Sequence, residues 1–270
     1  MLGLPDLQNV ETDAELKSCC TAVYESQWAS LLLGESFHPG GLDLTLRIGE
    51  LLQLSAEDRV LDVASGRGTS AFFLAERFGC EVVGVDYGRI AVQQANQLAR
   101  EKGLDHLVSF RQGDAEQLPF ADETFTAVIC ECAFCTFPNK KIAAAEMGRV
   151  VMRNGRFGMS DLTRNGSLPP ELETIIAWIA CIADAQPVAV YKKYIEDAGL
   201  TAREIEVHND ALAQLVHDVR GKLLGAELMV KLGKLDFPDA DFSQAKKIAR
   251  LAAESVRQGR LGYSVLVAQK

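Results

Sequence analysis

The chain has 270 residues, of which 48% are hydrophobic and 24% are charged, so it can form an ordinary globular domain with a sizeable core. Its formal net charge of −9 disfavours nucleic acid as a partner, because a polyanion would be repelled. The longest apolar stretch, residues 175–183, is shorter than the roughly 18 residues that cross a bilayer. The first residues, MLGLPDLQNVETDAEL, lack the basic start and apolar middle of a signal peptide, so we expect a cytoplasmic protein without a membrane partner.

Five apolar runs alternate with helical patterns through the first two thirds of the chain. The expected strands are residues 59–63, 81–85, 107–112, 126–130 and 156–160. A helix should begin near Thr69, and two others, near residues 90–102 and 142–151, stop at Gly103 and at Asn154-Gly155. This alternation predicts a parallel sheet with helices on both faces.

The last third should complete the sheet in an unusual way. Helices are expected at residues 178–184 and 188–198, followed by a sixth strand at 202–207 and a seventh at 262–268. Between these two strands, apolar residues recur at helical spacing on both sides of Phe237-Pro238-Asp239. Two amphipathic helices need something to cover, so we expect a cap or a dimer surface.

The motif VLDVASGRG at the end of the first expected strand is the most informative part of the chain. Gly66 and Gly68 carry no Cβ, so backbone can approach a nucleotide there. The run EVVGVDYG then places Asp86 at a strand end, where a carboxylate can accept hydrogen bonds from ribose hydroxyls. A third run, LVSFRQGDAEQLPF, ends in Asp114 and Ala115, where a carboxylate could reach an adenine amine.

These segments, followed in order by FTAVICECAF and EMGRVVMRNGRFGMSDL, resemble class I S-adenosylmethionine-dependent methyltransferases over residues 59–161. The glycines alone would also suit NAD, and the later segments argue against it. The resemblance implies a doubly wound α/β fold with a mainly parallel seven-stranded sheet. The corresponding division of the chain is an N-terminal helical lid at 1–58, a cofactor-binding core at 59–208 plus 262–270, and a helical insertion at 209–261.

The resemblance also implies S-adenosylmethionine as the cofactor and a small-molecule or metalloid substrate. Methyl transfer is an in-line displacement, so the protein mainly orients the reactants and excludes water. By resemblance, the cofactor site comprises Asp62, Ala64, Ser65, Gly66 and Gly68 around the methionine part, Asp86 at the ribose, Tyr87 on the adenine face, Asp114 and Ala115 at the adenine edge, and Cys130 and Glu131 beside the sulfonium. The chain is expected to act as a monomer or a homodimer.

The chain contains seven cysteines, which stay reduced in the cytoplasm. The segment CECAFC follows the fourth expected strand, at the sheet edge where substrates of such folds bind. Three thiolates from separate segments would suit a soft, thiophilic ion. ELKSCCTA, ICECAFCTFPNK and WIACIADA resemble the cysteine segments of arsenite methyltransferases, which implies Cys20, Cys132 and Cys181 as catalytic thiolates that hold arsenite, with Cys135 as a further ligand and no metal cofactor.

Several alternatives stay open at this point. The resembled family carries a further cysteine just after the first strand, where Thr69 and Ser70 stand here. The cysteines would only pack if the acceptor were a small organic metabolite methylated on carbon, nitrogen or oxygen, or if the chain were a non-catalytic cofactor-binding module. Cys132 and Cys135 also form the CxxC half of a zinc site, for which Cys19 and Cys20 are the candidate partners.

Aromatic and histidine side chains supply the remaining candidates. Tyr24 and Trp28 share a helical face at i, i+4 in the segment that would cover the cofactor, and Phe37 and His38 follow in the same segment. Two further residues, His208 and His217, are candidate general bases for an oxygen or nitrogen nucleophile.

Overall fold

The computed structural model describes residues 12–26, 34, 38–173, 177, 180–235 and 241–270. Trp28, Phe37, Trp178 and the break at 237–239 lie outside the described residues. Within the described part of the chain, none of the helices combines the length and apolar character needed to cross a membrane.

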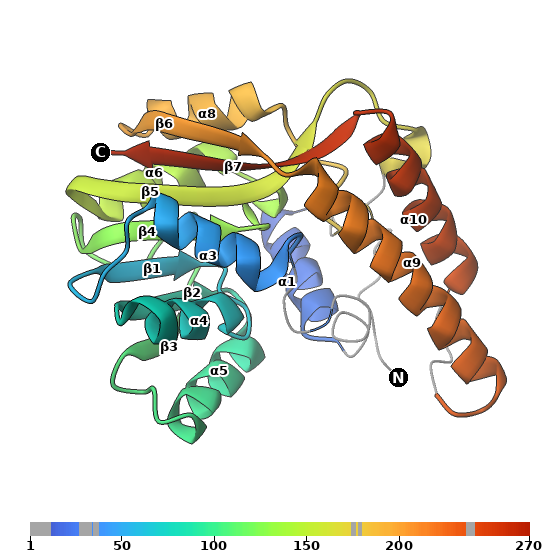
Figure 1. Cartoon of the computed structure of the whole chain (residues 1–270), viewed down its shortest axis with the longest axis horizontal. Coiled ribbons are helices and arrows are strands. Elements are labelled where there is room, and N and C mark those ends of the chain that lie inside the picture. Colours follow the sequence, from blue (N-terminus) through green and yellow to red (C-terminus); the bar gives the residue numbers. More distant parts are fainter. Residues whose placement is uncertain (1–11, 27–33, 35–37, 174–176, 178–179, 236–240) are drawn as a thin grey trace.

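Seven strands form one sheet in the order β3-β2-β1-β4-β5-β7-β6 (Figure 1). The strands are β1 (Arg59–Val63), β2 (Glu81–Asp86), β3 (Val108–Gln112), β4 (Phe125–Glu131), β5 (Val151–Arg164), β6 (Thr201–Val207) and β7 (Leu261–Gln269). All pairings are parallel except those of β7, which runs antiparallel to both β5 and β6. The expected doubly wound, mainly parallel α/β sheet is confirmed.

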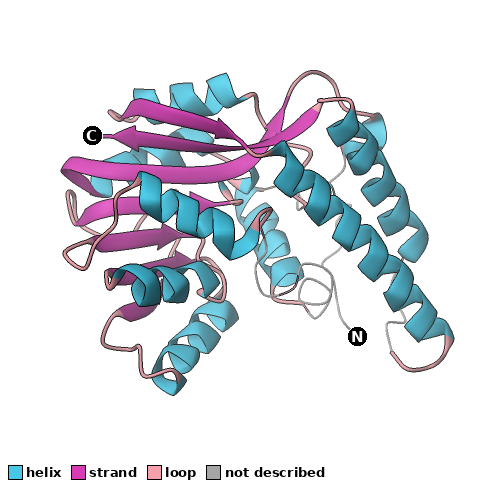
Figure 2. Cartoon of the chain, in the orientation of Figure 1, coloured by secondary structure: helices cyan, strands magenta, loops and turns pink. Residues whose placement is uncertain are grey.

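Helices cover both faces of the sheet, as Figure 2 shows. They are α1 (Asp13–Tyr24), α3 (Gly41–Leu51), α4 (Thr69–Phe78), α5 (Arg89–Glu101), α6 (Lys140–Val150), α8 (Val188–Asp197), α9 (Asn209–Lys231) and α10 (Phe242–Arg257), with short 3-10 turns at Phe134–Thr136 and Pro170–Leu172. Helix α3 packs against α4, and α6 packs against α8. The core between these layers is built from the apolar strand residues, because β1, β2 and β4 are buried almost from end to end.

The helix expected at residues 178–184 is wrong over its described part, where residues 180–184 form turns. Cys181 adopts a left-handed backbone conformation with φ of 62°, which a continuing helix does not allow. The backbone N–H groups of Ile182 and Ala183 both donate to the carbonyl of Ala177, so the chain folds back at this point. The turn places the Cys181 side chain toward the carboxyl end of β4, which a helix ladder would not do.

Two long helices, α9 and α10, lie in the chain between β6 and β7, where the sequence predicts a helical insertion (Figure 1). They pack against each other and extend away from the sheet. Leu212 and Leu223 of α9 and Ala249 and Ala252 of α10 are buried. The role of the pair as a cap or as a dimer surface stays a prediction.

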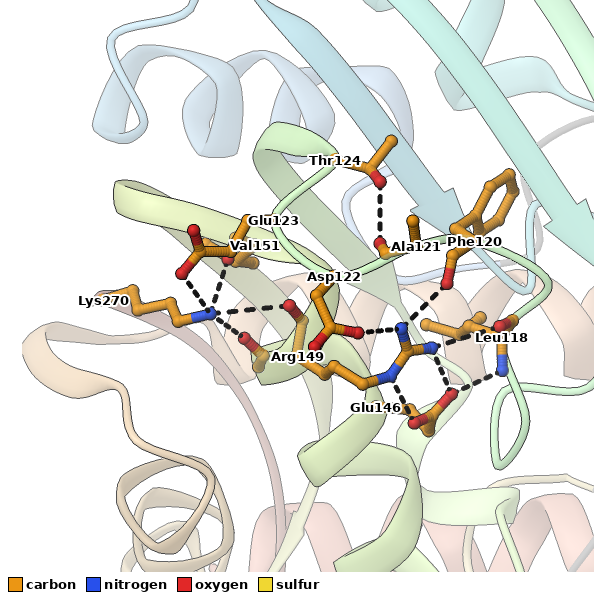
Figure 3. Close-up of polar contacts among 11 residues, drawn as sticks. Leu118, Phe120, Ala121, Asp122, Glu123, Thr124, Glu146, Arg149, Val151 and Lys270 are labelled. Atoms are coloured by element: carbon orange, nitrogen blue, oxygen red, sulfur yellow. Dashed lines mark hydrogen bonds and ion pairs between the residues drawn. The ribbon is translucent and has the colours of Figure 1, made fainter.

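Arg149 on α6 positions the segment that follows β3 (Figure 3). Its guanidinium donates to the carbonyls of Leu118 and Phe120 at 3.2 and 2.8 Å. Glu146 accepts from the Arg149 Nε at 2.7 Å and from the Leu118 N–H at 2.8 Å. These bonds tie the turn after Asp114 to the amphipathic helix behind it, so the EMGRV segment orients the GDAEQLPF segment.

Candidate active site

A cavity lies at the carboxyl ends of β1, β2 and β4, where the topology of an open α/β sheet places its ligands. Its lining includes most of the residues that the sequence assigns to a cofactor: Asp62, Ala64, Ser65, Gly66, Asp86, Tyr87, Asp114, Ala115 and Glu131. These side chains come from four separate segments of the chain, so the sheet brings together what the sequence holds far apart.

Gly68 and Cys130 lie outside the cavity lining, contrary to expectation. A Cβ on Gly68 would come within 2.3 Å of the Phe110 ring, so packing explains this glycine better than contact with a ligand does. Cys130 is 0% exposed and belongs to the core of the sheet. Because successive strand side chains point to opposite faces, Glu131 enters the cavity and Cys130 does not.

Asp62 and Ser65 each carry a buried polar atom whose hydrogen-bonding capacity is not satisfied by the described residues. The Oδ2 of Asp62 and the Oγ of Ser65 are buried and accept or donate no hydrogen bond among the described residues. Burial raises the pKa of Asp62 well above its ordinary value, and the nearby Glu131 and Asp86 carboxylates raise it further. A cationic or hydrogen-bonding ligand group in the cavity would satisfy both atoms.

Asp86 ends β2 as a fixed carboxylate. Its two oxygens accept from the backbone N–H of Gly66 at 2.8 Å and of Gly88 at 2.7 Å. Burial raises the pKa of Asp86, although these two backbone hydrogen bonds oppose the rise. The first of the bonds joins the β1 turn to the β2 turn, so the two segments that the sequence assigns to the cofactor are held in one arrangement.

Glu131 lies in a buried polar network on the opposite wall. The hydroxyl of Thr45 on α3 donates to both Glu131 oxygens, at 3.2 and 3.0 Å. The Nε2 of His38 lies 3.8 Å from Glu131 Oε2, and both side chains are almost fully buried. The sequence points to His38 and Glu131 separately, but Thr45 carries no motif and was missed.

Helix α1 covers the cavity and is fastened by two charged residues that sequence reasoning missed. Lys17 Nζ donates to Asp114 at 2.8 Å and to Glu116 at 2.7 Å. Glu25, just past the end of α1, accepts from the N–H of Ala91 at the start of α5. The carboxylate that the sequence assigns to an adenine amine is therefore already paired with Lys17 of α1.

Cys132 and Cys181 come together beside the cavity, as expected, although 49 positions separate them. Their sulfur atoms are 4.0 Å apart, and the hydroxyl of Tyr24 on α1 lies 3.6 Å from Cys181 Sγ. Both cysteines have positive φ, 51° and 62°, which is uncommon for a residue with a Cβ. The backbone is thus held in a costly conformation at both thiols.

The thiols in this group differ in acidity. Hydrogen bonds from the Cys132 and Cys135 thiols hold the pKa of Cys181 well below its ordinary value, whereas the pKa values of Cys132 and Cys135 are raised. Cys135 is buried behind this pair and does not line the cavity. Like Cys135, Cys181 is buried and does not line the cavity.

Cys20 approaches the same region from α1 and lines the cavity. Burial raises the pKa of the Cys20 thiol, and the nearby Cys181 raises it further. Cys80 is a buried core residue whose thiol donates to the carbonyl of Leu74, as its position at the start of a strand suggests. Among the described residues, no group of three or more His, Cys, Asp or Glu is arranged to hold a metal ion, so the zinc alternative gains no support.

A buried lysine holds the Cys181 turn in place. Lys140, at the start of α6, pairs with Asp184 and also donates to the carbonyl of Phe137 at 3.1 Å. Gln186 donates to Asp184 as well, at 3.1 Å. Nothing in the sequence around Lys140 signals this role, because its partner Asp184 lies 44 positions away.

The two histidines proposed as general bases do not line the cavity. His208 Nε2 lies 3.1 Å from Glu206 at the end of β6, and His217 is exposed on α9. His208 directly precedes α9, and His217 belongs to the solvent-facing surface of that helix. Their positions therefore need no catalytic explanation.

Comparison with known proteins agrees with this site. Residues 54–199 match the family model described as a methyltransferase domain. The methyltransferase GfsG of Streptomyces halstedii is 30% identical over 61% of this chain and 60% of its own length. An arsenite methyltransferase of Halobacterium salinarum is 29% identical over 61% of this chain and 44% of its own length. The matched region therefore covers less than two thirds of the length of each of these two relatives.

A solved structure matches the fold over a larger part of the chain. The phosphoethanolamine N-methyltransferase 2 of Haemonchus contortus, in complex with S-adenosyl-L-methionine, has a TM-score of 0.80 at 15% identity and covers 97% of this chain and 61% of that protein. The glycine turn, the strand-end carboxylates and the matched family model agree. The chain belongs to the methyltransferase domain family, among the class I S-adenosylmethionine-dependent methyltransferases.

Proposed function

We propose that this chain transfers a methyl group from S-adenosylmethionine to a small acceptor bound beside Cys132 and Cys181. The cofactor supplies a methyl group on a cationic sulfur. Asp62 and Ser65 offer unsatisfied polar atoms for its methionine part, and Asp86 presents a carboxylate for its ribose. A Cβ on Gly66 would meet nothing within 4 Å, so the turn leaves open space along the cavity.

The adenine end is proposed to lie between Tyr87, Asp114 and Ala115, which line the cavity beyond Asp86. Tyr87 is partly exposed and can cover one face of a planar ring. Asp114 can accept from an exocyclic amine only if it shares its carboxylate with Lys17. Helix α1 and its Lys17 then exclude water from the bound cofactor.

Replacing Asp86 with alanine should weaken the binding of S-adenosylhomocysteine by about 1.5 to 3 kcal/mol, the usual scale of a hydrogen bond to a charged group. The measurement is isothermal titration calorimetry. Asp86→Asn keeps one acceptor oxygen and should lose less. If both variants bind the ligand as the natural chain does, the ribose assignment is wrong.

The acceptor is proposed to be arsenite, and the single observation that carries this proposal is the 4.0 Å approach of the buried Cys181 thiol to that of Cys132, which lines the cavity. Trivalent arsenic prefers soft sulfur ligands. Each thiol that binds it loses a proton, which leaves with an arsenic hydroxide as water, while an As–S bond replaces an As–O bond. Cys132 and Cys20 both line the cavity, so Cys20 on α1 offers a third sulfur beside the Cys132 and Cys181 pair.

Arsenite held in this way keeps a lone pair on arsenic. The chain's contribution is to aim that lone pair along the cavity and to exclude water, since positioning dominates catalysis of an in-line displacement. The left-handed conformations of Cys132 and Cys181 serve this purpose, because they turn both side chains toward each other. Lys140 and Asp184 keep the second of these turns in place.

Incubation with S-adenosylmethionine, a thiol reductant and arsenite should yield methylated arsenic, detected by mass spectrometry. Cys132→Ser combined with Cys181→Ser should reduce the product to background, since serine oxygens are poor ligands for a soft ion. Cys80→Ala is the matched control, because Cys80 is a buried thiol distant from the cavity lining, and it should retain product formation. Absence of product with the natural chain would contradict arsenite as the acceptor.

A small organic acceptor is the second candidate, and the His38, Thr45 and Glu131 network favours it. His38 lines the cavity, and a neutral imidazole there can accept the proton that an oxygen or nitrogen nucleophile loses. Under this function the double cysteine variant keeps most of its turnover with the organic acceptor, whereas His38→Ala loses it. The two candidate functions are therefore distinguished by which variant loses turnover: the double cysteine variant for arsenite, and His38→Ala for the organic acceptor.

A further inference from the structure

Helix α9 exposes a stripe of leucines that nothing in the described structure covers. Leu224, Leu228 and Leu232 are 60%, 56% and 58% exposed, which is unusual for large apolar side chains. Their spacing of four residues places them on one side of the helix. Met229, adjacent on the same helix, is also exposed. We call Leu224, Leu228 and Leu232 the leucine stripe.

Basic residues are in excess in the part of the chain that carries the leucine stripe, although the whole chain has a formal net charge of −9. Basic residues outnumber acidic ones between residues 220 and 257; they are Arg220, Lys222, Lys231 and Lys234 beside the stripe and Lys246, Lys247, Arg250 and Arg257 on α10. Part of this charge is paired: Glu227 lies 3.0 Å from Lys231 and 2.7 Å from Lys246, and Lys247 lies 3.3 Å from Glu171. An exposed apolar face with a basic border is the pattern of helices that lie in a lipid interface.

The placement of α9 leaves this face accessible to a large partner. Both α9 and α10 extend away from the sheet, and the C-terminal end of α9 lies at an extremity of the molecule (Figure 1). The leucine stripe takes no part in the lining of the cavity. A flat surface can therefore meet α9 without obstructing the cofactor site.

We propose that the leucine stripe and its basic border dock this methyltransferase on an anionic lipid surface. The leucines enter the boundary between headgroups and acyl chains, and the lysines and arginines meet lipid phosphates. A second copy fits less well, because pairing two α9 helices would bring two basic borders together and their charges repel. The helix lies on the surface and does not span the bilayer, and the proposal holds for either acceptor.

Co-sedimentation with vesicles tests the proposal on the full chain. The protein should sediment with vesicles of equimolar phosphatidylcholine and phosphatidylglycerol, bind vesicles of phosphatidylcholine alone far less, and lose binding as salt is added. Leu224→Glu combined with Leu228→Glu should lower the association constant by about tenfold or more, because two apolar side chains no longer enter the interface. Ile142→Glu combined with Met152→Glu, two exposed apolar residues on other elements, is the matched control and should bind as the natural chain does.

Calorimetric binding of S-adenosylhomocysteine shows that both double variants are folded. Failure of the natural chain to sediment with the anionic vesicles would overturn the proposal, and so would equal binding by the Leu224 and Leu228 variant. Light scattering measures the oligomeric state and so tests whether a second copy of the chain, and not lipid, covers the leucine stripe. If the natural chain is a dimer that Leu224→Glu with Leu228→Glu dissociates, a second copy covers the stripe and the lipid proposal fails.

Discussion

Replacing Gly68 with alanine should lower the free energy of unfolding by about 3 kcal/mol, whereas the same change at Gly66 should cost about 1 kcal/mol. Both glycines have a left-handed backbone, with φ of 82° and 53°. They differ in what a Cβ would meet: at Gly68 it would lie 2.3 Å from Cζ of Phe110, and at Gly66 it would meet nothing within 4 Å. Phe110 cannot simply rotate away, because it packs edge-on against Phe72 with ring centroids 5.4 Å apart.

Urea denaturation measures the difference in unfolding free energy between the two variants. For ligand binding we expect the opposite order, with the larger loss at Gly66. Gly66 lines the cavity and donates to Asp86, so Gly66→Ala should weaken S-adenosylhomocysteine binding more than Gly68→Ala does in folded protein. Equal losses of stability at the two positions would show that Phe110 yields to the added methyl group. In that case close packing against Phe110 would not be the reason for a glycine at position 68.

The stability of the chain should fall between pH 4 and pH 7 because of Asp161, and Asp161→Asn should remove that part of the decline. Asp161 is 1% exposed, and burial raises its pKa to about 7. Its carboxylate accepts from the N–H of Cys135 and of Leu162, at 2.9 and 2.7 Å, and these bonds only partly offset the burial. Above its ordinary pKa near 3.8 the unfolded chain releases this proton while the folded chain keeps it.

Because the folded state binds more protons over this range, its stability decreases as the pH rises, by about 4 kcal/mol for a shift of this size. The decline should end once the pH exceeds about 7, where both states are ionised. The measurement is urea denaturation of the natural chain and of Asp161→Asn at several pH values. The variant loses one acceptor and starts less stable, but the gap between the two curves should close as the pH rises. Parallel curves would mean that the Asp161 carboxyl ionises as readily in the folded chain as in the unfolded one.

Regular elements were largely predictable from the sequence, because four of the seven expected strands are followed directly by glycine or an acidic residue. The first strand is Arg59–Val63, as expected, and the sixth and seventh differ from their expected bounds by only a residue at one or both ends. Strand β5 is longer than expected, since Asn154 at φ of 61° interrupts its pattern without ending its pairing. Local stop signals thus predict the existence of an element better than they predict its first and last residues.

The lid contacts and the Cys181 turn could not be read from the sequence. Lys17 meets Asp114 across 97 positions, and an amphipathic helix carries no mark of which partner its lysine will choose. Cys181 takes a left-handed conformation that sequence signals reserve for glycine or asparagine, so a helix was the natural expectation. The energy that holds this turn comes from tertiary partners, Lys140 among them, which no local pattern contains.

Strand β7 lies between β5 and β6 in the sheet, yet it is the last of the three to be synthesised. Until it arrives, β5 has an unpaired edge and β6 has no neighbour, so β6 emerges from the ribosome with nothing to join. The strands that carry the Asp62 and Asp86 carboxylates, β1 and β2, already pair with each other. On the growing chain the nucleotide half can therefore assemble first, and the final strand closes the sheet as a late, long-range step that is open to mispairing.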